Sequence, residues 1–223
     1  MVEQLLLPLA ARSDFSAEDF IVSACNEAAA GLVAAWPRWP GRVCVIVGAE
    51  GAGKTHLGHI WRARAGARLA APGDAEAMIG EPAPLLIDDA DASAFDETAF
   101  FHLLNLSKER GFDMLLTARI PPGEWTAALP DLRSRFRSLP FVAIAAPDDE
   151  LLRLLLIKHF ADRQVTVAPD VIAFLIPRIE RTAAAARDIA RDLDAAALRH
   201  GRPVTRALAR DVLQARRASG LEE

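Results

Sequence analysis

The stretch VCVIVGAEGAGKTHL, residues 43–57, decides the fold of this chain. Its first five residues are apolar and mostly β-branched, a pattern typical of a buried strand. Gly48, Gly53, Lys54 and Thr55 then fit the phosphate-loop pattern G-x-x-x-x-G-K-[ST], which needs a strand before it and a helix after it. Without a side chain in the way, the loop amides can face an anion at the helix start. The stretch predicts a nucleotide-phosphate site; the alternative is a glycine-rich turn that binds nothing.

Each position of this loop has an expected role. Lys54 is expected to reach the β- and γ-phosphates, and the Thr55 hydroxyl is expected to hold Mg²⁺. The expected ligand is therefore ATP or ADP together with Mg²⁺. The residues predicted to contact the nucleotide are Gly48, Gly51, Ala52, Gly53, Lys54, Thr55, His56 and Ile21.

A second stretch, PLLIDDAD at residues 84–91, places carboxylates directly after an apolar run. In a parallel sheet the carboxyl ends of the strands form the edge where ligands bind. Asp88 is therefore predicted to hold Mg²⁺ through water, and Asp89 to polarise an attacking water. Thr117, at the end of the apolar run 114–118, is predicted to touch the γ-phosphate or that water. The alternative for 84–91 is a strand followed by an Asp-rich turn.

The composition is that of an ordinary globular protein. Of 223 residues, 52% are hydrophobic and 25% charged, enough for one large domain or two small ones. The net charge of −4 supplies no overall basic field for nucleic acid. Cys25 and Cys44 follow no disulfide pattern, which favours a reducing compartment. The N-terminus does not read as a signal peptide, and no apolar stretch has the length of a membrane span. We therefore expect a cytoplasmic protein without a membrane partner.

Strands and helices are predicted to alternate as far as residue 146. This alternation favours an α/β fold with a parallel five-stranded sheet sandwiched by helices. A short edge segment is expected at 20–22, and the tryptophans of loop 36–41 are expected to pack between helix and sheet. The expected strands are 43–47, 67–70, 84–87, 114–118 and 141–145, and the expected helices are 25–36, 54–65, 74–79, 96–110 and 131–137.

The pattern then changes to helices alone, which predicts a second, smaller all-helical domain. Its expected helices are 150–163, 170–181 with a kink at Pro177, 182–199 and 204–217. The predicted division of the chain is an extended peptide at 1–12, an α/β nucleotide-binding domain at 13–146 and a helical lid domain at 147–223.

The N-terminal peptide QLLLPL, residues 4–9, is short and apolar. Pro8 prevents a helix and biases Leu7 towards an extended backbone. Such a peptide suits docking in an apolar groove of another protein. The alternative from the residues alone is an arm that packs on its own domain.

Together these pieces resemble the DnaA-type AAA+ ATPase family. The resemblance covers nearly the whole chain and within the family is greatest to the DnaA-related regulatory inactivators. It is carried by the phosphate loop, by the carboxylates of 84–91, by the segments LTARIPP at 116–122 and RSRF at 133–136, and by the helical lid. The region between Arg68 and Pro84 is too short for the extra helices with which DnaA-type initiators engage single-stranded DNA. By the resemblance, a DNA-binding domain would follow the lid as in DnaA, and we expect this protein to lack it.

The resemblance implies partners and a role. Arg135 corresponds to the arginine finger, a guanidinium that reaches the nucleotide of a neighbouring subunit; Arg133 and Arg137 are the neighbours most easily confused with it. The partners implied are DnaA, the DNA polymerase sliding clamp, DNA through the clamp, and a second copy of the chain. The implied role is negative regulation of the initiation of chromosome replication. The residues implied to bind the clamp are Gln4, Leu5, Leu7, Pro8 and Leu9.

Two positions depart from the family pattern. Arg119 stands where an aspartate is usual, and Ala184 stands where the lid usually carries a nucleotide-sensing arginine, with Arg187 one turn later. Both departures weaken the expectation of efficient hydrolysis by the chain itself. Three alternatives stay open: an ATPase of the initiator or helicase-loader type that handles DNA directly, a clamp-loader-like subunit, and a kinase for a small metabolite.

Overall fold

The computed structural model describes residues 15–70, 82–91 and 96–219. The predicted N-terminal peptide and the predicted helix at 74–79 lie outside these residues. Among the residues described, no helix combines the length and the apolar character that crossing a bilayer would require.

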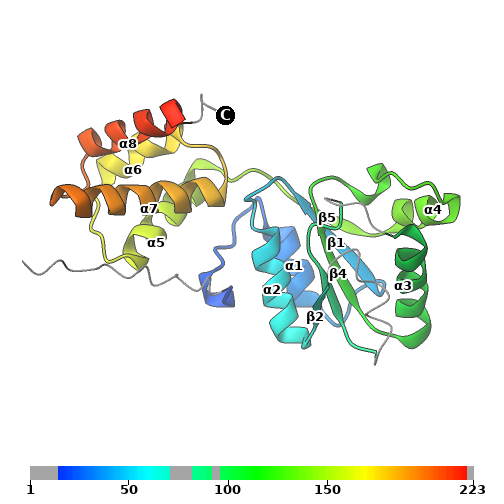
Figure 1. The fold of residues 1–223 in the computed structure, drawn as a ribbon. Helices are drawn as coiled ribbons and strands as arrows, with labels where there is room; N and C mark the ends of the chain where they lie inside the picture. The colour runs from blue at the N-terminus through cyan, green and yellow to red at the C-terminus, as the bar shows by residue number, and fades with distance from the viewer. Residues whose placement is uncertain (1–14, 71–81, 92–95, 220–223) are drawn as a thin grey trace, which may run out of the picture.

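A five-stranded parallel sheet lies at the centre of the first part of the chain, as predicted (Figure 1). The strand order is β2-β3-β4-β1-β5, so β1 lies between β4 and β5. All of β1 is buried, which explains its run of apolar residues. The strands are β1 (Val43–Gly48), β2 (Arg68–Ala70), β3 (Leu85–Ile87), β4 (Met114–Ala118) and β5 (Phe141–Ile144).

Helices cover both faces of the sheet (Figure 1). One face packs on α1 (Glu27–Ala35) and α2 (Lys54–Ala65), and the other on α3 (Glu97–Arg110) and α4 (Pro130–Ser138). Because side chains alternate along a strand, Val45 enters the cluster under α3 and α4 while its neighbour Ile46 enters the cluster under α1 and α2. A short 3₁₀ turn, η3 (Pro122–Glu124), precedes α4.

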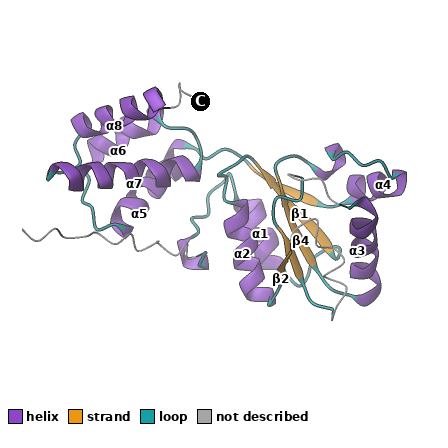
Figure 2. Cartoon of the chain, in the orientation of Figure 1, coloured by secondary structure: helices purple, strands orange, loops and turns teal. Residues whose placement is uncertain are grey.

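Helices alone form the second part of the chain (Figure 2). The predicted kink at Pro177 is a short 3₁₀ turn, η4 (Ile176–Arg178), which follows α6 directly. This lid has its own buried cluster, which includes Leu193 and Ile189 of α7. Asp148 and Thr182 cap the starts of α5 and α7, and the left-handed Gly201 ends α7. The helices are α5 (Asp149–Asp162), α6 (Pro169–Leu175), α7 (Ala183–His200) and α8 (Arg206–Ser219).

Residues 15–26, which we name the bracing segment, touch both parts. The segment contains one 3₁₀ turn, η1 (Ala17–Asp19), and no strand, so the predicted edge strand at 20–22 is wrong. The reason is the side chain of Asn26, whose amide nitrogen donates to the Ile21 carbonyl at 3.0 Å and whose oxygen accepts from the Ser23 amide at 2.9 Å. The asparagine thus takes up main-chain groups that a strand would have offered to the sheet.

The tryptophans pack between helices and sheet, as predicted. The ring of Trp39 stacks on Trp61 of α2 at 5.3 Å, and the ring of Trp36 meets Trp61 edge-on at 6.3 Å. Cys44 is buried in the same cluster, and burial raises the pKa of its thiol to about 12. The cysteine therefore serves as a small core residue rather than a reactive thiol.

Candidate functional site

The loop between β1 and α2 has the backbone that the motif predicts. Gly51 and Gly53 both have positive φ, +71° and +97°, a region that L side chains rarely adopt. Gly53 is also the residue directly before α2, where the free amides of the first helical turn begin. The loop therefore fits a phosphate group at the start of a helix of twelve residues.

Lys54, the first residue of α2, lies inside this loop. Its side chain is buried, and its ammonium donates to the carbonyl of Ala49 at 3.1 Å. The loop is thus wrapped around a buried cation. A cation held this way next to open amides is suited to polyphosphate, because it costs the protein no further ordering when the anion arrives.

Thr55, Asp88 and Thr117 meet at the carboxyl edge of the sheet. The Thr55 hydroxyl donates to one oxygen of Asp88 at 2.9 Å, and the Thr117 hydroxyl donates to the other at 2.5 Å. The two residues predicted to hold Mg²⁺, Thr55 and Asp88, are therefore in direct contact. Hydroxyl and carboxylate oxygens are the ligand types that this cation prefers.

Thr55 and Asp88 by themselves would not complete the coordination of a magnesium ion. Among the residues described, no group of three or more His, Cys, Asp or Glu gathers to form a protein-only metal site. A magnesium ion at Thr55 and Asp88 would take its other ligands from phosphate and water, which is the usual arrangement for this ion. The oxygen pair therefore fits a cation that arrives with a nucleotide.

Thr117 and Asp89, both predicted to be catalytic, are held in one local network. Thr117 is fully buried, and its hydroxyl oxygen accepts from the Asp89 amide at 2.9 Å while its carbonyl accepts from the Ala90 amide at 2.8 Å. Asp89 adopts a left-handed backbone with φ +49°. Thr117 is thus turned towards the carboxylates after β3, and it orders the loop that carries them.

His56 and Ile21, two of the predicted nucleotide contacts, meet the bracing segment and the lid in this structure. The His56 ring lies 2.9 Å from the Ser16 carbonyl and edge-on to Phe20 at 5.3 Å. Ile21 packs at the margin of the lid cluster. Phe20 lies closest to the loop, because a Cβ built on Gly53 would come 3.3 Å from its ring. No sequence pattern singles out Phe20, since an aromatic residue in a connecting segment is common.

The lid touches the phosphate loop through its longest helix. The Ala183 amide, at the start of α7, donates to the Gly51 carbonyl at 3.0 Å. A Cβ built on Gly51 would come 2.8 Å from the Ala184 methyl, so the phosphate loop and the start of α7 are in close contact there. Beside this contact is a hollow of about 510 Å³, lined by Glu50, Gly51, Arg178, Ile179, Glu180, Thr182, Ala184, Ala185, Asp188, Leu213, Arg216 and Arg217.

Asp91 has a role that the sequence analysis missed. One of its carboxylate oxygens accepts from the amides of Arg119 and Ile120, at 2.7 and 2.9 Å, and so fixes the turn after β4. The other oxygen is buried without a hydrogen-bond partner among the described residues. The sequence pattern marks Asp88 and Asp89 as carboxylates at the end of a strand. It does not show that Asp91, two residues later, has a different role.

The structure gives Arg133 and Arg135 of α4 different contacts. The Arg133 guanidinium donates twice to the Ala127 carbonyl, at 3.2 and 2.6 Å, and is held against its own domain. Arg135 is exposed; it donates to the Asn105 side chain at 3.1 Å and lies 5.9 Å from the Phe101 ring. Arg135, the predicted finger, is therefore an exposed side chain that makes only weak contacts with its own domain.

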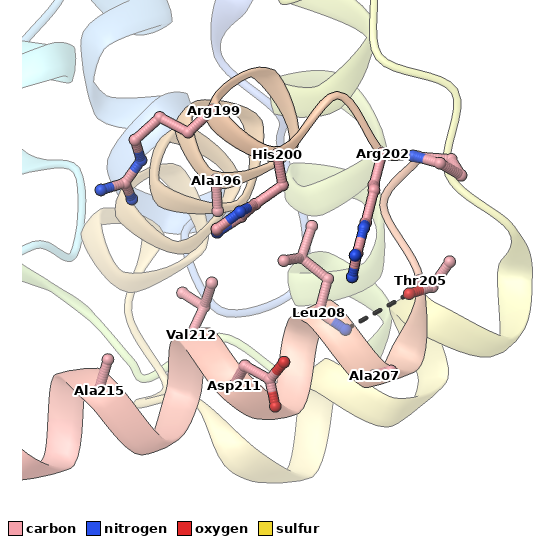
Figure 3. Close-up of a pocket in the computed structure, with 11 residues that line it drawn as sticks. Ala196, Arg199, His200, Arg202, Thr205, Ala207, Leu208, Asp211, Val212 and Ala215 are labelled. Atoms are coloured by element: carbon pink, nitrogen blue, oxygen red, sulfur yellow. Dashed lines mark hydrogen bonds between the residues drawn. The ribbon is translucent and has the colours of Figure 1, made fainter.

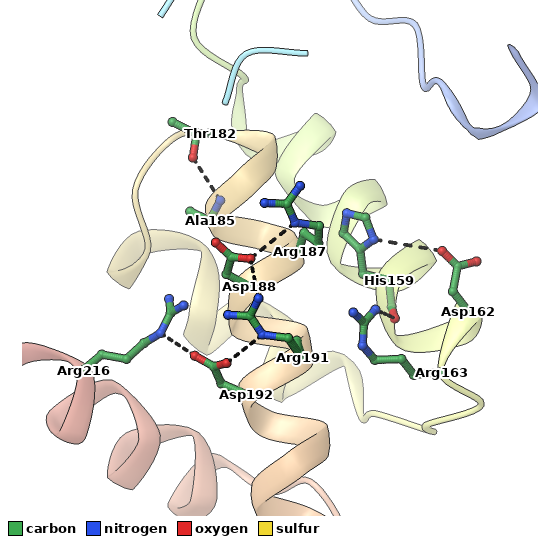
Figure 4. A network of polar contacts seen from close by, with 10 residues as sticks. All are labelled: His159, Asp162, Arg163, Thr182, Ala185, Arg187, Asp188, Arg191, Asp192 and Arg216. Atoms are coloured by element: carbon green, nitrogen blue, oxygen red, sulfur yellow. Dashed lines mark hydrogen bonds and ion pairs between the residues drawn. The ribbon is translucent and has the colours of Figure 1, made fainter. Parts of the chain in front are cut away.

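The lid carries two further polar features. Acidic and basic side chains alternate along α7, where Asp188 pairs with Arg191 at 3.3 Å and Asp192 pairs with Arg216 of α8 at 2.7 Å (Figure 4). A hollow of about 450 Å³ opens between the end of α7 and α8 (Figure 3). The Asp192–Arg216 ion pair joins α7 to α8, whereas the Asp188–Arg191 pair lies within α7.

The comparisons with known sequences support the resemblance to DnaA. No protein-family profile matches the chain. Over 99 residues, 43% of its length, the chain is 32% identical to the chromosomal replication initiator protein DnaA of Cutibacterium acnes. The chain spans about a fifth of the length of that relative, 20%.

Several solved structures share the fold. Domain III of the Thermotoga maritima DnaA superposes with a TM-score of 0.77 at 20% identity, over 91% of this chain and 96% of that one. The AMPPCP-bound DnaA of Aquifex aeolicus gives 0.69 at 21% identity, over 80% and 64%. The Thermotoga maritima RuvB Holliday junction branch migration motor gives 0.73 at 16% identity, over 90% and 71%. From sheet order to lid, the chain therefore has the DnaA-like AAA+ fold, that of DnaA domain III.

Proposed function

We propose that this chain is a nucleotide-binding AAA+ regulator of the type of Hda, the DnaA-related regulatory inactivator, which docks on the DNA polymerase sliding clamp and stimulates ATP hydrolysis by DnaA. Through that reaction it limits the initiation of chromosome replication. The observation that carries the proposal is the displayed Arg135 in a chain that combines the fold of DnaA domain III with a formed phosphate loop. The proposed role and partners extend the sequence resemblance. The proposed nucleotide binding also rests on the geometry of the phosphate loop.

ATP or ADP with Mg²⁺ is the proposed ligand. The left-handed Gly51 and Gly53 and the buried Lys54 support binding of the phosphates. The contact between Thr55 and Asp88 supports a magnesium site. A related fold, the DnaA of Aquifex aeolicus, is known with the triphosphate analogue AMPPCP bound. When bound, the metal ion neutralises phosphate charge; the chain's own residues hold the phosphates and fix their orientation.

Arg135 is proposed to act on the nucleotide of DnaA rather than on that of its own chain. It is exposed on α4, and its contacts to Asn105 and Phe101 are those of a surface side chain. Such contacts are worth little, so a partner's phosphate can replace them. A planar and permanently charged guanidinium stabilises the charge of the transferring phosphoryl group. Supplied by a partner protein, an arginine of this kind raises the rate of hydrolysis on the order of 10³-fold or more.

The proposed clamp contact is the peptide of Gln4, Leu5, Leu7, Pro8 and Leu9, which lies outside the described residues. Its support is the sequence pattern of an extended apolar peptide. The described chain begins at Phe15, whose ring stacks on His59 of α2 at 4.4 Å. A clamp held by the peptide would thus be joined to the AAA+ core by a few residues only, with DNA reached through the clamp.

Hydrolysis by the chain itself is proposed to be slow. Asp89 and Thr117 are the groups proposed to act on an attacking water, but Thr117 is turned towards Asp88 and is fully buried. The lid places a methyl group, Ala184, against the loop where a cation would stabilise the terminal phosphate. The chain therefore binds nucleotide mainly to set its own conformation and acts on its partner's nucleotide.

A reconstituted DnaA ATPase assay with clamp and DNA tests this function. Wild type is expected to stimulate hydrolysis by DnaA, and Arg135→Ala is expected to lose on the order of 10³-fold of the stimulated rate or to fall to background. Arg137→Ala is the matched control, because it removes an exposed arginine two residues away on the same helix. Stimulation by Arg135→Ala at the wild-type level would show that the finger assignment is wrong.

The clamp contact is tested by a pull-down with the purified sliding clamp. Replacing Gln4 and Leu7 together by alanine is expected to abolish capture and the clamp dependence of the ATPase assay. Undiminished capture would remove the clamp from the proposal. Nucleotide-dependent binding of DNA without the clamp, with a steep dependence on salt, would instead favour an ATPase that handles DNA directly.

A further inference from the structure

The front of the bracing segment packs on α2, the helix that begins with Lys54. The Phe15 ring stacks on the His59 ring, with the ring centroids 4.4 Å apart and an angle of 6° between the planes. The Phe15 ring also meets the His56 ring edge-on at 5.5 Å. Both histidines lie in the first half of α2. The front of the segment is therefore attached to the helix that carries the phosphate-binding lysine.

A second set of contacts runs from the same segment to the phosphate loop. The His56 ring nitrogen lies 2.9 Å from the Ser16 carbonyl oxygen, and the Phe20 ring meets the His56 ring edge-on at 5.3 Å. A Cβ built on Gly53 would come 3.3 Å from the Phe20 ring, so this ring lies next to the loop. The segment thus contacts the site at Gly53 and at His56, on either side of Lys54 in the sequence.

These contacts hold the segment only loosely. No side chain from Phe15 to Cys25 is buried, and Asn26 is the first buried residue of the segment. Segments with few buried contacts open at a small cost in free energy. The bracing segment therefore has two accessible states, one seated on α2 as in this structure and one released from it.

The seated state holds the loop in the form that a phosphate requires. Gly53 has a φ of +97° directly before the start of α2, and the Phe20 ring lies against it. Release of Phe20 would free Gly53 to adopt other backbone conformations, because glycine has access to more of them than any other residue. A loop that is already ordered loses less entropy when it binds its ligand. We therefore expect the seated state to bind nucleotide more tightly than the released state.

The bracing segment continues towards the N-terminus into the peptide that is proposed to bind the clamp. Residues 10–14 are all that separate Leu9 from Phe15 in the sequence. A partner that holds the peptide would keep Phe15 within roughly 20 Å of the bound leucine, the reach of a chain of this length. Phe15 then loses less freedom when it seats on α2. A partner on the peptide therefore favours the same seated state that nucleotide favours.

We propose that the bracing segment couples these two binding sites. A sliding clamp bound to residues 4–9 raises the affinity of the phosphate loop for nucleotide, and nucleotide raises the affinity for the clamp by the same factor. The coupling rests on the proposed nucleotide and clamp contacts, and it adds their mutual regulation. Phe15 and His59 are positioning residues, because neither lies in the phosphate loop or in the clamp-binding peptide.

Calorimetric titration of the full chain with ADP and Mg²⁺, with and without saturating purified sliding clamp, tests the coupling. The clamp is expected to strengthen ADP binding by about fivefold or more, an ordinary value for coupling between two sites. Titration with the clamp, with and without ADP, is expected to give the same factor. In the variant with both Gln4 and Leu7 changed to alanine, the clamp is expected to have no effect on ADP.

Two substitutions at the contact between the segment and α2 separate coupling from binding. Phe15→Ala and His59→Gln are each expected to weaken ADP by at most about tenfold, the value of one aromatic pair. In both variants the clamp is still captured but no longer changes the affinity for ADP. The matched controls are Phe141→Ala, an exposed phenylalanine on β5, and His102→Gln, an exposed histidine on α3, and both are expected to keep the coupling. Thermal unfolding checks that each variant is folded.

Three outcomes would overturn the coupling alone. One is binding of ADP and of the clamp in which neither changes the affinity for the other, and another is weaker ADP binding in the presence of the clamp. The third is coupling that persists in both Phe15→Ala and His59→Gln. Failure of the wild type to bind ADP, or to bind the clamp, would instead overturn the proposed function from which the coupling starts.

Discussion

The α/β part and the helical lid meet the phosphate loop with different chemistry. The sheet side contributes charged and hydroxyl side chains, Lys54, Thr55 and Asp88. The lid contributes a main-chain amide, Ala183, and a methyl group, Ala184. The difference predicts that the α/β part recognises phosphate, whereas the lid supplies closure and shape. Variants of the two parts should therefore fail in different assays.

The first test concerns stability, because each part has a separate buried cluster. Leu193, fully buried on α7, is expected to cost about 3 kcal/mol of unfolding free energy when changed to alanine, through lost contacts and a cavity. Leu198→Ala on the same helix is the control, since that leucine is 71% exposed and its loss should cost almost nothing. Chemical denaturation followed by circular dichroism measures both.

Leu116→Ala, in the sheet cluster, completes this test. If the two parts unfold separately, Leu193→Ala moves only the transition of the lid and Leu116→Ala only that of the sheet. A single transition that shifts equally in both variants would contradict the separation.

The second test removes the buried cation of the loop. Lys54→Ala is expected to weaken ADP about a hundredfold, because charge-assisted contacts to phosphate are lost. Lys108→Ala, which removes an exposed lysine near the end of α3, is the control for net charge and should bind as wild type. Calorimetry gives the affinities. Unaltered binding by Lys54→Ala would show that the nucleotide does not lie in this loop.

The third test uses pH and concerns the lid alone. Burial, followed by nearby Lys158 and Arg163, lowers the pKa of His159 to about 4 from its ordinary value of 6.5 (Figure 4). The folded lid thus favours the neutral His159 ring. The free energy of unfolding is therefore unaffected by this group above pH 6.5, and it falls below pH 6.5 because the unfolded state takes up a proton there. Between pH 7 and 5 the loss is about 2 kcal/mol.

His159→Gln is expected to flatten this part of the pH profile. The exposed His200, at the end of α7, is the control, and His200→Gln should leave the profile of wild type. Thermal unfolding at a series of pH values measures how the free energy of unfolding changes with pH. The affinity of the α/β part for nucleotide should change only weakly over the same pH range. An unchanged slope in His159→Gln would contradict the buried neutral ring.

The smallest effect tests the contact between the two parts. Gly51→Ala combines an unfavourable positive φ with a Cβ that would press on Ala184, whereas Gly66→Ala has a positive φ and open space around it. Each is expected to cost about 1 kcal/mol for the backbone. Gly51→Ala should cost more, by the amount needed to displace the lid. Equal losses in the two variants would mean that the lid does not rest on the loop in solution.

Local patterns explain how far the sequence could predict this molecule. The strand before Gly48, the helix after Lys54 and the carboxylate after β3 follow from hydrophobic runs and a motif with fixed spacing, and the five-stranded sheet confirms them. The structure also brings the predicted Thr55 and Asp88 into contact. Both are positioned by the ends of regular elements, which sequence patterns locate well.

The remaining features depend on pairs of residues that no local pattern connects. Asp91 fixes the turn at Arg119 from a neighbouring strand end, and Arg119 meets Glu50 only because β4 lies beside β1. The predicted edge strand at 20–22 failed for a related reason, since Asn26 binds the main chain that would have joined the sheet. Side-chain capture of a backbone group is decided in three dimensions, and residue type alone does not reveal it.

The bracing segment has a mechanical consequence. Phe15 and Ser16 hold it to α2, Asp19 forms an ion pair with Lys158 of α5 at 2.8 Å, and the Cys25 carbonyl accepts from the Ala145 amide beyond β5. A force on the residues before Phe15 would therefore act where the α/β part meets the lid, and both parts would resist it. If a partner held the residues before Phe15, the bracing segment would be restrained as well. Motion of the lid relative to the α/β part would then be reduced, so that binding of the partner and closure of the lid would be coupled.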